Sequence, residues 1–71
     1  MNDQLHDLLR DAEPPFTIAT TSGRSYRIDD RSYIWVPEAY REIICLAIPH
    51  QGLAFIRIGS IESVHTEHHG D

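Results

Sequence analysis

The amino-acid sequence predicts a mainly β domain, a small five-stranded antiparallel barrel with an N-terminal α-helix. Two observations lead to this prediction. The spacing of apolar residues changes from a helical period to a period of two after Pro14 and Pro15. Short apolar runs then alternate with turns that contain glycine or proline, at a spacing typical of small barrels. The chain has 71 residues, enough for one domain, which we divide into a helix at about 3–12, a barrel at about 16–65 and a flexible tail at 66–71.

The first thirteen residues predict an amphipathic helix. Its apolar face consists of positions i, i+3, i+4 and i+7, which are Leu5, Leu8, Leu9 and Ala12. The two prolines that follow end the helix, because a residue before proline is pushed out of the helical region. A helix of about three turns is marginal alone, so we expect its leucines to dock on the rest of the domain.

Five strands are expected in the remainder of the chain. The first places Phe16, Ile18 and Thr20 on one face, and Gly23 supplies a turn residue before the return strand. A polar bend at 29–32 interrupts the second strand, which then resumes. The expected ranges are 16–21, 25–28 together with 33–36, 43–48, 53–58 and 61–64.

The runs 43–48 and 53–58 are apolar on both faces, whereas a barrel has only one interior. Something must therefore cover the outer face of at least one of them. The helix is one candidate, and an edge strand of a neighbouring subunit is another. A chain this short also gains little net stability from its own core. The sequence therefore predicts a homo-oligomer.

Composition limits the possible partners and locations. The formal net charge of −5 argues against a broad electrostatic grip on duplex DNA, although several arginines could still form a local basic groove. No apolar run approaches the length of a membrane helix and no signal-peptide pattern opens the chain, so we expect a cytoplasmic protein without a membrane partner. Cys45 is the only cysteine, which excludes an intrachain disulfide, and we interpret it as a small hydrophobe. The arginines in question are Arg24, Arg27, Arg31 and Arg57.

The sequence shows no catalytic pattern. Its four glycines are isolated, so they form no phosphate-binding loop, and nothing in the spacing of serine, histidine and acidic residues supports a triad. We therefore expect no enzyme activity and no cofactor. One metal-like cluster lies near the C-terminus, but a frayed tail does not fix four ligands in a tetrahedron. We expect no physiological metal there, and a histidine-rich metal-responsive module stays open as a weaker alternative. The cluster consists of His65, His68 and His69 with Glu62 and Glu67.

Several scattered positions carry a resemblance to a known family. The first group is Leu5, Leu9, Arg10, Pro15, Ile18 and Gly23, the second is the segment 31–36, and the third is Phe55-Ile56-Arg57 with Gly59, followed by 61–64. In this order the chain resembles the Sm-like (LSm/Hfq-like) proteins, over roughly residues 5 to 64. The resemblance implies an SH3-like barrel that forms a homo-oligomer and binds single-stranded RNA. It implies that Tyr33 stacks on a base and that Arg57 lines a pore, with Arg31 as a further RNA contact.

Two more expectations follow. The segments 15–18 and 23–28 also resemble a group of short uncharacterised bacterial proteins with a Pro-Phe strand and a Gly-Arg hairpin. For the oligomer we expect an interface in the last two strands, formed by Phe55, Ile56, Ile58, Ile61 and Val64. The leading hypothesis is a non-catalytic Sm-like binding module, for which single-stranded RNA is a candidate ligand. The alternative is a protein-interaction or scaffold barrel without nucleic acid, bound to an unknown protein.

Overall fold

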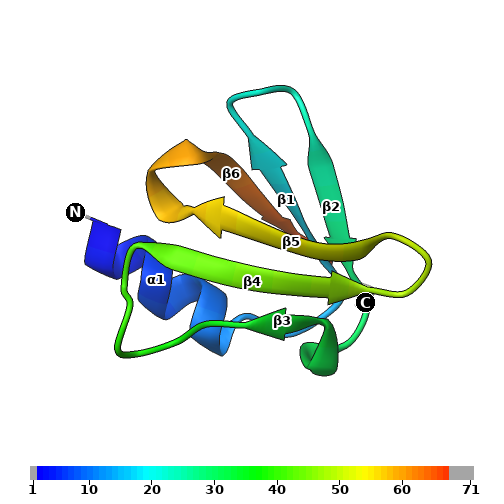
Figure 1. The fold of residues 1–71 in the computed structure, drawn as a ribbon, viewed down its shortest axis with the longest axis horizontal. Helices are drawn as coiled ribbons and strands as arrows, with labels where there is room; N and C mark the ends of the chain where they lie inside the picture. The colour runs from blue at the N-terminus through cyan, green and yellow to red at the C-terminus, as the bar shows by residue number, and fades with distance from the viewer. Residues whose placement is uncertain (1, 68–71) are drawn as a thin grey trace.

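The computed structural model describes residues 2–67, with the backbone only for 2 and 3. Within this range one helix precedes six strands in two three-stranded antiparallel sheets, ordered β2-β1-β6 and β3-β4-β5 (Figure 1). The elements are α1 (Asn2–Asp11), β1 (Phe16–Thr20), β2 (Ser25–Ile28), η1 (Arg31–Tyr33), β3 (Ile34–Trp35), β4 (Ile43–Ile48), β5 (Gly52–Arg57), η2 (Ile58–Ser60) and β6 (Ile61–Thr66).

The prediction of a five-stranded barrel is wrong, because the two sheets over residues 2–67 do not join into one closed sheet. The expected second strand is in fact two strands, β2 and β3, which belong to different sheets. The 3-10 turn η1 separates them, and the side chain of Asp30 caps this turn by accepting a hydrogen bond from the amide of Ser32 at 2.9 Å. A second 3-10 turn, η2, redirects the chain between β5 and β6, and these two strands lie in different sheets as well.

The core lies between the two sheets and α1. Strand β1 buries alternate residues, so the predicted common face of Phe16, Ile18 and Thr20 is confirmed. In the other sheet, Ile44 and Leu46 of β4 point inward and are fully buried. The buried apolar side chains are Leu9, Ala12, Phe16, Ile18, Ile28, Ile34, Ile44, Leu46, Ile56, Ile58 and Ile61.

Helix α1 docks on the domain with a face rotated from the predicted one. Leu9 and Ala12 are buried as expected, but Leu8 remains 47% exposed and His6 is completely buried. A guanidinium nitrogen of Arg31 donates 3.0 Å hydrogen bonds to the carbonyl oxygens of Leu9 and Ala12. Because the last carbonyls of a helix lack partners inside it, Arg31 closes the C-terminal end of α1.

The β4–β5 hairpin turns through two residues with positive φ, His50 at 69° and Gly52 at 79°. The amide of Gln51 donates to the carbonyl of Ile48 at 3.0 Å within this turn. At the other end of the chain, β6 continues to Thr66, the first residue of the predicted tail, and residues 68–71 lie outside the described range. Among the described residues, no helix has the length and apolar character needed to cross a membrane.

Candidate functional site

The outward-facing side of the β3-β4-β5 sheet carries a row of apolar side chains. Trp35 pairs with Cys45 in the register of β3 and β4, and Cys45 pairs with Phe55 in the register of β4 and β5. Side chains of directly paired residues lie on the same side of a sheet, so these three form one row across all three strands. Leu53 lies two residues before Phe55 on the same side. The inward neighbours Ile34, Ile44 and Ile56 are buried.

We call this surface the outer face and define it as Trp35, Pro37, Tyr40, Ile43, Cys45, Leu53 and Phe55. Its large side chains are unusually open to solvent. The exposed fractions are 63% for Trp35, 69% for Tyr40, 38% for Ile43, 69% for Leu53 and 70% for Phe55. Helix α1 contributes His6, Leu9 and Ala12 to the interior instead. The helix therefore does not cover the outer face, which was one of the two possibilities raised by the sequence.

A groove of about 250 Å³ runs along the outer face. Six of the seven outer-face residues line it, and Leu53 lies beyond the lining. Apart from the Cys45 thiol and the Tyr40 hydroxyl, the lining side chains carry hydrocarbon and the indole of Trp35. No carboxylate, imidazole or guanidinium is among them. The groove is therefore apolar, and its lining holds no acid–base pair.

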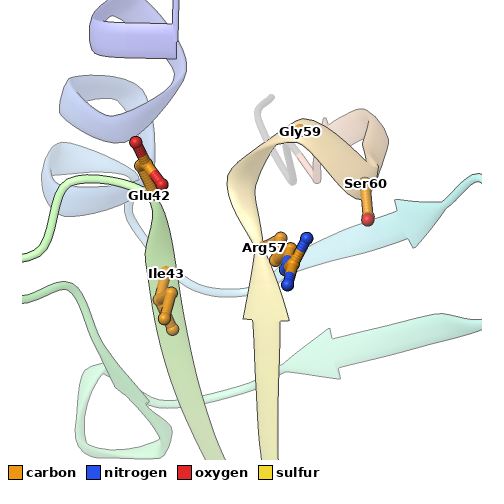
Figure 2. Close-up of a pocket in the computed structure, with 5 residues that line it drawn as sticks. All are labelled: Glu42, Ile43, Arg57, Gly59 and Ser60. Atoms are coloured by element: carbon orange, nitrogen blue, oxygen red, sulfur yellow. The ribbon is translucent and has the colours of Figure 1, made fainter.

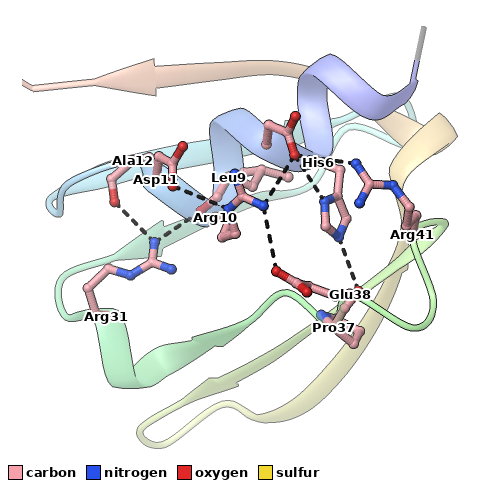
Figure 3. A network of polar contacts seen from close by, with 10 residues as sticks. His6, Leu9, Arg10, Asp11, Ala12, Arg31, Pro37, Glu38 and Arg41 are labelled. Carbon is pink, nitrogen blue, oxygen red and sulfur yellow. Dashed lines mark hydrogen bonds and ion pairs between the residues drawn. The ribbon is translucent and has the colours of Figure 1, made fainter.

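The segment 36–42, which carries Tyr40, is held against α1 by polar contacts (Figure 3). The buried ring of His6 bonds through Nε2 to the carbonyl oxygen of Pro37 at 3.1 Å, and this nitrogen is the donor because a carbonyl oxygen only accepts. Arg41 donates to Asp7 at 3.3 Å, and Arg10 lies 3.7 Å from Glu38. These contacts fix the segment to the helix, so one side of the groove is preorganised.

Two details of this network bear on its strength. Nδ1 of His6 is buried without a hydrogen-bond partner among the described residues, and it lies 3.7 Å from Asp7. The hydrogen bond and the charge of Asp11, followed by the charge of Asp7, raise the pKa of Arg10. The carboxylates thus keep Arg10 charged, but its exposure makes each ion pair weak. The buried His6–Pro37 bond is the main anchor of the segment.

A second, polar pocket of about 650 Å³ opens where β4 begins and β5 ends (Figure 2). Its lining consists of Glu42, Ile43, Arg57, Gly59 and Ser60. Figure 2 shows Arg57 at the end of β5 and Glu42 at the start of β4. The pocket therefore combines one acidic and one basic side chain beside the apolar outer face, with Ile43 shared between the two.

The structure separates the three residues that the resemblance implies for RNA. Tyr33 is half-buried and packs against the core, and Arg31 caps α1 as described above. Arg57 pairs with Ile43, whereas Ile34 pairs with Leu46, three residues further along β4. At about 3.3 Å per residue, Arg57 and the turn η1 lie more than about 10 Å apart along the sheet. They do not form one contiguous cluster.

The residues expected at an oligomer interface are distributed differently from the outer face. Phe55 is exposed, but Ile56, Ile58 and Ile61 belong to the core and Val64 packs against it. Among the predicted interface residues, Phe55 alone offers a surface to a partner. Trp35 was interpreted from the sequence as a core or subunit-interface residue, whereas Tyr40 and Leu53 were not predicted. The signal for this face in the sequence is that the runs 43–48 and 53–58 are apolar on both sides.

Two members of the predicted histidine cluster, His65 and Glu67, have defined contacts in the structure. His65 Nε2 is hydrogen-bonded to Ser63 Oγ at 3.0 Å, while His68 and His69 lie outside the described residues. Glu67 forms an ion pair with Arg27, and the hydrogen bonds that Arg27 donates to Glu67 and then to Asp29 raise the pKa of Arg27. Over residues 2–67 no three histidine, cysteine or acidic side chains come together as a metal site.

Comparisons with protein-family models, with curated protein sequences and with solved structures give no match to this chain. The resemblance to the Sm-like proteins therefore stays a prediction.

Proposed function

We propose that this chain is a non-catalytic protein-interaction module that binds its partner through the outer face. The observation that carries the proposal is the contiguous row of the exposed Trp35, the half-buried Cys45 and the exposed Phe55, with Tyr40 and Leu53 beside it. Large, mostly exposed apolar side chains gathered on one face mark binding surfaces in soluble proteins. A cytoplasmic location is part of the same proposal.

The size of the exposed surface supports this proposal. An aromatic side chain has about 150–250 Å² of surface, so Trp35, Tyr40 and Phe55, each about two-thirds exposed, present roughly 400 Å² together. Leu53 and Ile43 raise the total to about 500–600 Å². The largest apolar patch on a typical monomer covers about 300–600 Å² and is often functional. The outer face of this small domain reaches the upper end of that range.

The charges favour a protein partner over single-stranded RNA. Aromatic side chains also stack on bases, but RNA-binding grooves combine them with cations that track the backbone. Four of the arginines already serve the domain itself: Arg10, Arg27 and Arg41 pair with carboxylates, and Arg31 binds helix carbonyls. The acidic side chains outnumber the basic ones by eleven to six. In the three strands of this sheet, Arg57 is the cation on the outer side, since it pairs with Ile43, and one cation does not track an RNA backbone.

The amphiphilic dye 8-anilinonaphthalene-1-sulfonate, whose aromatic rings bind apolar surfaces, tests whether the outer face is an accessible binding surface in the native state. We expect the wild-type chain to enhance dye fluorescence and Phe55→Ser to lose most of that enhancement. Leu8→Ser is the matched control, because Leu8 is a half-exposed leucine on α1, away from the outer face. It should behave like the wild type. Equal dye binding by wild type and Phe55→Ser would contradict the proposal.

A labelled oligouridine, added in parallel at low and high salt, tests the RNA alternative. We expect no binding that depends on Trp35 or Arg57. Binding that is lost in Arg57→Ala and weakens steeply with salt would replace the protein-interaction proposal with RNA binding.

A further inference from the structure

We infer that the occupant of the outer face is a second copy of this chain, and that two copies pack face to face about a two-fold axis. This inference rests on the proposed function and names its partner. A symmetric contact of this kind needs a self-complementary surface, so that what one copy presents the other accepts. The outer face contains both parts: a groove, and apolar side chains beside it.

The groove and its neighbour Leu53 supply this complementarity. The groove lies between Trp35, Tyr40 and Phe55, and Leu53 is 69% exposed on the same side but outside the lining. Leu53 and Phe55 are two residues apart on one strand, so their side chains are about 7 Å apart along β5. A two-fold axis between Leu53 and the groove places the leucine of each copy in the groove of the other.

The available area is sufficient for such a dimer. The large apolar side chains of the outer face expose about 500–600 Å² per copy, or roughly 1,000–1,200 Å² for two copies. Ala47 is exposed on the same side of β4 and adds to this area, as does the half-buried Cys45. A stable specific interface buries about 1,200–2,000 Å² in total. The outer face therefore suits a dimer at the lower end of this range, which forms reversibly with concentration.

The charges give this contact a diagnostic salt dependence. No ionised group lines the groove, and Arg57 is the cation beside it on the outer side of β5. Each copy nevertheless carries a formal charge of −5, and two copies repel each other. Added salt screens that repulsion, so dimerisation should strengthen with salt. Binding to a nucleic acid or to a strongly basic partner would weaken instead.

Trp35 reports the contact directly, because it is the only tryptophan of the chain and lines the groove of the outer face. The experiment is a concentration series of the full chain, with the mass measured by light scattering and the Trp35 emission recorded on the same samples. We expect the mass to rise from 8.1 kDa to twice that value, with a blue shift of the emission at the same midpoint. Higher salt should move the midpoint to lower protein concentration.

The substitution Leu53→Glu should weaken dimerisation by at least about 30-fold, the effect of losing a central anchor. Circular dichroism should show this variant folded, since Leu53 is mostly exposed in the monomer. Leu8→Glu is the control and should dimerise like the wild type. A dimer that forms equally in Leu53→Glu, or without a shift of the Trp35 emission, would overturn the inference.

Two further outcomes separate this inference from the proposed function. A mass of one chain at every concentration, with dye binding still lost in Phe55→Ser, would overturn the second copy as occupant and leave an interaction face for another protein. A monomer whose dye binding does not depend on Phe55 would overturn both. A larger ring of five to seven chains would also overturn the face-to-face dimer.

Discussion

The same substitution, leucine to alanine, should cost much more stability on the buried side of the β3-β4-β5 sheet than on the outer side. Leu46 on β4 is fully buried, whereas Leu53 on β5 is 69% exposed. Leu46→Ala removes core contacts and leaves a cavity, which costs about 2–5 kcal/mol. Leu53 buries only about a third of a side chain whose full burial contributes about 1.5–3 kcal/mol, so Leu53→Ala should cost less than about 1 kcal/mol.

The loss of stability expected for Leu46→Ala is large relative to the total stability of the domain. At about 0.05–0.15 kcal/mol per residue, 71 residues give a total stability of about 4–10 kcal/mol. A loss of about 3 kcal/mol in Leu46→Ala therefore lowers Tm by roughly 12–24 °C for a domain of this size. We expect Leu53→Ala to shift Tm by only a few degrees, about 4–8 °C at most.

Urea denaturation followed by far-UV circular dichroism measures both variants. It should be done at low protein concentration, where the monomer dominates. At high concentration, Leu53→Ala should show an additional loss of apparent stability, because a partner that binds only the folded state stabilises it by mass action. If Leu53→Ala destabilised the dilute protein as much as Leu46→Ala, Leu53 would be a core residue and the assignment of the two faces would be refuted.

Three further predictions concern the turns and the helix end. Gly52→Ala should cost about 1–2 kcal/mol in urea unfolding, because the φ of Gly52 is 79° and a side chain is strained there whatever the space. Gly59→Ala is the control and should change stability by less than about 0.5 kcal/mol, since its added methyl meets open space. Arg31→Ala should cost about 1 kcal/mol and speed hydrogen exchange in the last turn of α1; unchanged exchange would contradict the capping role. Hydrogen bonds from the amide and then the hydroxyl of Ser32 lower the pKa of Asp30. The stabilisation from Asp30 is therefore present above its unfolded-state pKa of about 4 and is lost as the pH falls below that value. Asp30→Asn keeps the acceptor, so on acidification the wild type should lose more stability than this variant in pH-dependent unfolding, and parallel pH profiles would contradict the assignment.

Local patterns in the sequence predicted most of the helix and strand positions, but not how the strands pair into sheets. The period of two placed Phe16 and Ile18 on the buried face, and the prolines after α1 marked its end. The prediction of a barrel was wrong because of the two 3-10 turns, η1 and η2, each of which connects strands of different sheets. The segment 29–32 was expected as a bend within one strand, yet the cap from Asp30 forms a 3-10 turn that sends β2 and β3 into different sheets. Strand pairing depends on such turns and on contacts distant in sequence, which local periodicity does not encode.

The outer face was partly predictable. The apolar character of both sides of 43–48 and 53–58 indicated an uncovered surface and a partner. The contribution of Tyr40 was not predictable, because the segment 37–42 shows no periodicity and its position depends on the buried bond from His6 to Pro37. The rotated face of α1 was not predictable for the same reason. The spacing of the leucines predicted that Leu8 is buried, but His6 is buried instead, and its imidazole is hydrogen-bonded to the carbonyl oxygen of Pro37.

The central claim is that the outer face is open to solvent in the single folded chain and closes only on a partner. Acrylamide quenching of Trp35 fluorescence tests it most directly, because the chain has no other tryptophan. In dilute folded protein, we predict efficient quenching, close to that of the urea-unfolded chain, in line with the 63% exposure of Trp35. The quenching should fall as the protein concentration rises. Strong protection of Trp35 in the dilute, folded monomer would contradict the claim.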